Sequence, residues 1–151
     1  MFHSIMKGNT KVLLLVFSVL CFGLLIYATT RTESLYLNQW LGHVGGNSLK
    51  DFLQNLFSLI SIPSWMIYSL PDALWMLALI LVVMMIWDFK LNRRSIPWIA
   101  GAFCAGILFE VGQSFHLIRG TFDFIDLISI SIGALIPVFF TLLNMRLCKL
   151  K

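Results

Sequence analysis

The chain has 151 residues, of which 59% are hydrophobic and 12% are charged, and its formal net charge is +4. Soluble domains carry about 25% charged residues, so this composition argues against a water-soluble fold and indicates a lipid environment. The basic residues flank apolar runs instead of forming a patch, so the positive charge predicts no nucleic-acid partner. We expect a single membrane domain over residues 1–151.

The first apolar run covers residues 12–30 and follows Lys7 and Lys11. As a helix at about 1.5 Å per residue it reaches about 28 Å, which is enough to cross the hydrocarbon core. The run is longer than the apolar core of a signal peptide, which has about 7–15 residues, and Tyr27, Ala28 and Thr29 make a poor cleavage site. We therefore predict a transmembrane helix here and not a cleaved leader.

The loop that follows contains a glycine-rich stretch and then a segment whose apolar residues recur at helical spacing. This apolar face consists of Leu49, Phe52, Leu53, Leu56, Phe57 and Ile60. The segment is too short to span a bilayer and Pro63 ends it, so we predict a short interfacial helix over about residues 49–61. The surface Leu49–Ile60 is a candidate contact for a membrane protein partner.

Three further apolar runs predict transmembrane helices over about residues 71–87, 95–118 and 123–144. The predicted fold class is all-α, a polytopic membrane protein with four transmembrane helices and the interfacial helix in its first outer loop. The basic residues set the orientation, because cytoplasmic flanks carry the excess of lysine and arginine. One side carries Lys7, Lys11, Lys90, Arg93, Arg94, Arg146, Lys149 and Lys151, and the other carries Arg31, Lys50 and Arg119. Both termini are therefore expected in the cytoplasm, and all acidic residues except Asp88 fall toward the outer face.

Glu110 is the most informative polar residue, because it lies well inside the third predicted span. Ionisable groups at the centre of a span cost about 2.5–3.5 kcal/mol on insertion scales, so this carboxyl group should face the bundle or a water-filled cavity. Gln113 follows three residues later on the same helix face, and Gly106 lies one turn below, where it allows another helix to approach. This face predicts a functional site.

Asp123 and Asp126 share one face of the fourth span, which a short turn containing Arg119 joins to the third. The short connection should bring these groups close to Glu110 at the outer end, with Asp72 of the second span as a neighbour. Arg119 suits a bidentate contact with an anionic group. Structural interpretations stay open: both Asp72 and Asp123 suit helix N-termini, Arg119 suits an interfacial anchor, and Glu110 suits a buried hydrogen bond.

Six residues across the third and fourth spans, read in order, resemble the signature of the VanZ-like family of small bacterial membrane proteins: Glu110, Gln113, Arg119, Asp123, Asp126 and Gly133. Pro71 and Asp72 are similar to that family's Pro-Asp element, so the likeness covers about residues 70–137. The family commonly carries a lysine and a histidine where this chain has Ala73 and Met76, and an asparagine where it has Ile130. The resemblance implies a protein of the bacterial cytoplasmic (inner) membrane that is linked to the cell envelope and, through the family's namesake, to low-level resistance to the glycopeptide teicoplanin.

Two functions compete. In the first, the polar residues form a site, open to the outer leaflet, for a membrane lipid or a lipid-linked or amphiphilic envelope molecule. Arg119, Gln113 and Asp72 would bind this substrate, Glu110 would act as general acid or base, and Asp123 or Asp126 would orient it or hold a cation. In the second, the protein is a non-enzymatic membrane partner or scaffold, and the same cluster joins its helices.

Other chemistry finds little support. No metal-ligand spacing or CxxC pair connects the histidines and cysteines, which are His3, His43, His116, Cys21, Cys104 and Cys148, so neither a metal nor a cofactor is predicted. Proton or ion translocation is disfavoured, because the cytoplasmic halves of the spans contain no ionisable residue apart from Asp88 at the boundary.

Overall fold

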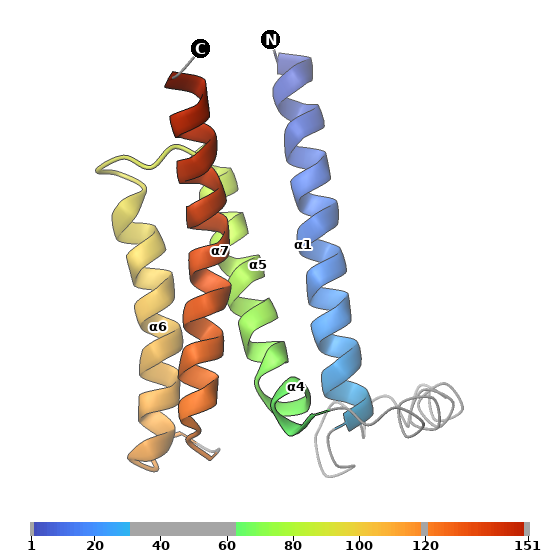
Figure 1. Ribbon diagram of the computed structural model, residues 1–151, viewed down its shortest axis with the longest axis vertical. Helices are drawn as coiled ribbons and strands as arrows, with labels where there is room; N and C mark the ends of the chain where they lie inside the picture. Colours follow the sequence, from blue (N-terminus) through green and yellow to red (C-terminus); the bar gives the residue numbers. More distant parts are fainter. Residues whose placement is uncertain (1, 31–62, 119–120, 150–151) are drawn as a thin grey trace.

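The computed structural model describes residues 2–30, 63–118 and 121–149, and this part of the chain is helical without strands. The helices are α1 (Phe2–Thr30), α4 (Ser64–Tyr68), α5 (Leu70–Ile86), α6 (Ile96–Ser114) and α7 (Phe124–Lys149) (Figure 1). Four stretches are long and apolar enough to cross a membrane: Thr10–Tyr27, Trp65–Ile86, Ile96–Ser114 and Phe124–Leu143. The all-α class and the four candidate spans are thereby confirmed, whereas the predicted interfacial helix lies outside the described residues.

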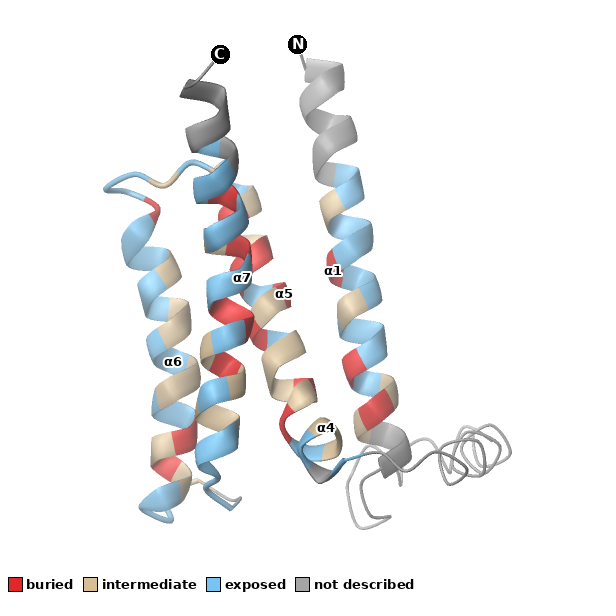
Figure 2. Ribbon diagram, in the orientation of Figure 1, coloured by how far each residue is buried: buried red, intermediate tan, exposed pale blue. Residues whose placement is uncertain are grey.

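The long helices stand side by side, and α5 holds them together. α5 packs against α7 on one side and α1 on the other, and α6 packs against both α5 and α7. The largest buried cluster lies where α5 meets α7, as Figure 2 shows, and consists of Met76, Ile80, Met84, Ile130 and Ala134. A smaller cluster of Val16, Ala78 and Leu81 fixes α1 to α5.

The outward faces of these helices are apolar. Leu14, Ile86 and Trp98 are 61%, 69% and 64% exposed, and many other large apolar side chains are exposed as well. Soluble monomers rarely expose contiguous apolar surfaces of this kind, and such surfaces mark membrane or protein contacts. The apolar outer surface of the bundle is therefore compatible with a lipid bilayer, in agreement with the composition.

Two glycines allow three helices to converge. A Cβ atom on Gly133 of α7 would overlap the backbone carbonyl oxygen of Ala73 in α5, and one on Gly106 of α6 would meet the terminal methyl of Met76. Close backbone approach at small residues is a common way for helices to pack in membranes. Because Ala73 directly follows Asp72, the contact at Gly133 also fixes the height of that carboxyl group relative to α7.

The third span ends earlier than the sequence predicts. The prediction extends to residue 118, whereas α6 ends at Ser114. The chain closes the helix with a Schellman motif, in which the Leu117 N–H donates to the Gly112 carbonyl at 2.9 Å and the His116 N–H donates to that of Gln113 at 3.0 Å. His116 adopts φ 58°, a position that glycine usually fills. Glu110 consequently lies one turn from the end of its helix, closer to the end than expected.

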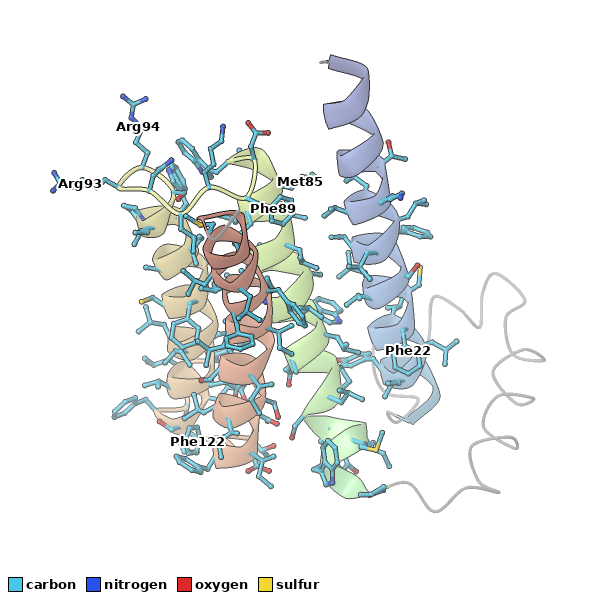
Figure 3. All side chains as sticks on the ribbon, turned by 45° about the horizontal axis from the view of Figure 1, so that its top comes forward. Phe22, Met85, Phe89, Arg93, Arg94 and Phe122 are labelled. Atoms are coloured by element: carbon cyan, nitrogen blue, oxygen red, sulfur yellow. The ribbon has the colours of Figure 1, made fainter. Side chains whose placement is uncertain are left out.

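The two ends of the bundle differ in charge. Both termini lie at one end, together with the connection from α5 to α6 (Figure 1). Arg93 and Arg94 on this connection are exposed and point away from the bundle (Figure 3). The opposite end, where Phe122 lies, contains the first turns of α5 and α7 with Asp72 and Asp126. The segregation matches the charge pattern from which the orientation is predicted.

Candidate functional site

A cleft of about 1040 Å³ is lined by side chains of α1, α4, α5, α6 and α7. Its apolar part is lined by Val16 and Leu20 of α1, Leu79 and Val82 of α5, and Gly106 of α6. Its polar end is lined by Tyr27, Tyr68, Asp72, Glu110, Gln113, Thr121, Asp123 and Asp126. Asp72 and Val82 are ten residues apart in α5, so the lining changes from polar to apolar over about 15 Å.

Three carboxyl groups from three helices meet at the polar end, and we call them the carboxylate cluster. Asp72, Glu110 and Asp126 each contribute an oxygen atom that lies within 4.8 Å of the other two. Glu110 is buried, with 5% of its surface exposed. The Gln113 side-chain amide donates to Glu110 Oε1 at 3.3 Å. Glu110 Oε2 and Asp126 Oδ1 are buried and have no hydrogen-bond partner in residues 2–30, 63–118 and 121–149.

Two members of the cluster occupy the first turns of helices. α5 begins at Leu70, directly after Ser69, which separates it from α4, and Asp72 lies in the first turn of α5. Asp126 lies in the first turn of α7. The positive end of a helix dipole favours negative charge, so both positions stabilise a carboxylate as well as presenting it to the cleft. Glu110 has no such support, because it lies near the C-terminal end of α6.

Asp123 has a structural role in addition to lining the cleft. Its Oδ1 accepts a hydrogen bond from the Ile125 N–H at 2.9 Å, which makes Asp123 the N-cap of α7. Loss of such a cap costs about 0.5–2 kcal/mol. The capping interpretation that the sequence left open for Asp123 is therefore realised, and its predicted catalytic role stays a prediction.

The structure brings together five of the six predicted site residues, namely Asp72, Glu110, Gln113, Asp123 and Asp126, around one cleft. Arg119 lies outside the described residues. Sequence reasoning missed the cleft residues Tyr27, Tyr68 and Thr121. Tyr27 and Tyr68 lie near the ends of spans, where aromatic residues also suit the membrane interface, so their residue type alone does not indicate a binding site.

The floor of the cleft is apolar in this chain. Met76 and Ile130, which occupy positions where the resemblance would lead to a histidine and an asparagine, line the cleft and belong to the buried cluster between α5 and α7. Each is 5% exposed. The polar side chains of this cleft therefore lie at the polar end described above, and Met76 and Ile130 add none.

Comparison with known proteins found no matching family model, no matching curated protein and no matching solved structure.

Proposed function

We propose that the protein is a VanZ-like membrane protein of the bacterial cytoplasmic membrane whose cleft receives a lipid-linked or amphiphilic molecule of the cell envelope. Its termini would face the cytoplasm, and the carboxylate cluster would lie toward the outer leaflet. The observation that carries the proposal is one continuous cleft that joins the carboxylate cluster to an apolar wall. This arrangement matches an amphiphile, with its head group at the carboxyl groups and its chain along Leu20, Leu79 and Val82.

The polar end would supply the affinity for such a ligand. A hydrocarbon chain that already lies among lipid tails gains little from moving against another apolar surface. Polar contacts in a partly buried site are stronger than in water, so the head group would determine which molecule binds. The apolar wall would set the orientation of the chain and the depth of the head group.

Within this site each polar residue receives a role. Glu110 would be the general acid or base, because it is buried, has one unpartnered oxygen and is positioned by Gln113. Asp123 or Asp126 would orient Glu110 or hold a cation, and Asp72 would contact the head group. Arg119, which follows α6 in the sequence, would contact an anionic group of the ligand.

The unpartnered oxygens argue against the scaffold alternative. A cluster that served only to join helices would be expected to pair its buried acceptors, because an unsatisfied buried acceptor is unfavourable by about 1–3 kcal/mol. Among the residues that the structure describes, nothing pairs with Glu110 Oε2 or Asp126 Oδ1. A site prepared for a ligand accounts for these groups more directly.

The Glu110→Gln variant tests the function. The substitution keeps the size of the side chain but removes its charge and its capacity for acid-base chemistry. Cells that express the wild type should become less susceptible to teicoplanin, and Glu110→Gln at matched membrane levels should give at least about a tenfold smaller effect, since acid-base groups contribute about 10²–10⁴-fold.

Asp88→Asn provides the matched control. Asp88 is an exposed carboxyl group at the other end of the bundle, where its nearest cation is Lys90 at 3.9 Å. Asparagine also tolerates the positive φ of this position. This variant should protect as well as the wild type. Equal protection by wild type and Glu110→Gln would contradict the role of Glu110, and no protection by the wild type would contradict the link to glycopeptides. A Glu110→Gln chain that fails to accumulate would favour the scaffold.

A further inference from the structure

The polar end of the cleft concentrates negative charge. Four carboxyl groups line it, those of Asp72, Glu110, Asp123 and Asp126, and the described lining residues include no lysine, arginine or histidine. Repulsion between like charges grows where water is excluded, because the effective dielectric constant falls. A bound cation would reduce this repulsion and stabilise the ionised form of these side chains.

A second observation identifies where that ligand would bind. Glu110 is buried, with only 5% of its surface exposed. Within the described part of the chain, its Oε2 has no hydrogen-bond partner, and neither has the buried Oδ1 of Asp126. These acceptors belong to the carboxylate cluster and line the cleft. A cation bound among them would satisfy both oxygens at once.

We propose that Asp72, Glu110 and Asp126 bind one hard divalent cation of the Mg²⁺, Mn²⁺ or Ca²⁺ class. One oxygen of each residue lies within 4.8 Å of the other two. Oxygen atoms bonded to one Ca²⁺ ion at about 2.3–2.6 Å are at most about 5 Å apart, so the three side chains already stand at the separation of common ligands.

The type of donor selects the ion. All three ligands are carboxylate oxygens, which prefer hard cations over Zn²⁺ or Cu²⁺. The two described cysteines, Cys21 and Cys104, are exposed and do not line the cleft. The sequence alone predicts no metal, because the ligands come from α5, α6 and α7 and have no characteristic spacing along the chain.

Three protein ligands leave part of the coordination shell open. Mg²⁺ takes six ligands and Ca²⁺ six to eight, so water or an anionic oxygen of a molecule in the cleft would complete the shell. A phosphate on the head group has the required chemistry. This last step rests on the proposed function, whereas binding of the cation rests on the carboxylate cluster alone.

The experiment is a titration of the purified full chain in detergent with Mn²⁺, after removal of bound metal with EDTA. Electron paramagnetic resonance of free Mn²⁺ gives the number of ions bound and their affinity. We expect one Mn²⁺ per chain, displaced by Mg²⁺ or Ca²⁺, and a higher unfolding temperature in its presence, because a ligand that binds only the folded state stabilises it. Asp72→Asn, Glu110→Gln and Asp126→Asn should each weaken binding at least about tenfold, and Asp88→Asn should leave it unchanged.

The controls separate the outcomes. Circular dichroism establishes whether each variant is folded. If a variant does not fold, the number of Mn²⁺ ions bound to the wild type still tests the proposal. Absence of a bound ion in the wild type, or equal loss of binding in Asp88→Asn, would overturn the proposal. Leu20→Trp, which changes only the apolar part of the cleft, should bind Mn²⁺ normally, so failure of the metal site and failure of the amphiphile site can be distinguished.

Discussion

Replacing Gly133 with alanine should destabilise the bundle and disturb the carboxylate cluster. The added methyl group would overlap the carbonyl oxygen of Ala73, a backbone atom that cannot move without shifting α5. Overpacking of this kind costs about 1–3 kcal/mol, which exceeds the helix propensity that alanine gains over glycine, about 1 kcal/mol. Thermal unfolding in detergent should show a lower midpoint, and Mn²⁺ affinity should fall because Asp72 moves with Ala73.

Alanine substitutions at two other glycines provide comparisons for the loss of stability expected in Gly133→Ala. At Gly106 the added methyl would meet the flexible end of Met76, so Gly106→Ala should destabilise less than Gly133→Ala. At Gly101 nothing lies within 4 Å, so Gly101→Ala should be neutral or stabilising by up to about 1 kcal/mol. The expected order of stability is Gly101→Ala, then Gly106→Ala, then Gly133→Ala. Equal midpoints for Gly133→Ala and Gly101→Ala would show that α5 and α7 are not in backbone contact.

Replacing Leu20 with tryptophan should empty the cleft of its ligand. Leu20 lines the apolar part of the cleft, and the larger indole would occupy space that the chain of an amphiphile needs. Displacing a ligand by overpacking of about 1–3 kcal/mol corresponds to a loss of about fivefold to about 150-fold in affinity. Native mass spectrometry of protein extracted from bacterial membranes should show a retained amphiphile on the wild type and little on Leu20→Trp.

Leu14→Trp is the matched control for this experiment. It makes the same exchange on the same helix, but Leu14 is 61% exposed and does not line the cleft. It should retain the amphiphile at the level of the wild type. Equal retention by all three proteins would mean that the bound molecule lies elsewhere on the apolar surface.

The sequence was sufficient to predict the class of fold and the proximity of most of the residues at the polar end of the cleft. Long uncharged runs predict the spans because few alternatives satisfy their backbone groups in lipid. The short connection between α6 and α7 forces their facing ends together, so Glu110, Gln113 and Asp126 could be placed in one region. The position of Asp72 at the same end of the bundle followed from the direction of the second span.

The end of α6 could not be predicted because a backbone conformation, and not a characteristic residue type, ends the helix. A Schellman motif usually places glycine at the left-handed position, whereas here His116 adopts φ 58°. Asp88 does the same at the end of α5 with φ 51°. Neither residue type distinguishes a helix end from a continuing helix in an apolar run.

The cleft itself was beyond sequence reasoning because it depends on where α1 packs. Leu14 and Leu20 look alike in an apolar run, yet one is mainly exposed and the other lines the cleft. In lipid an apolar side chain gains little hydrophobic free energy by packing on a helix instead of facing the bilayer. The complementarity of side-chain shapes therefore determines which face of α1 packs, and the sequence pattern does not reveal it. The contribution of Tyr27 to the polar end depends on the same packing.

Determination of the wild-type structure in nanodiscs made from bacterial membrane lipids tests the central claim most directly. The proposed function predicts an elongated density in the cleft, with its polar end within contact distance of Glu110 and Asp126 and its chain against Val16 and Leu20. A cleft closed by α1 against α6, with the carboxylate cluster paired to protein side chains, would contradict it.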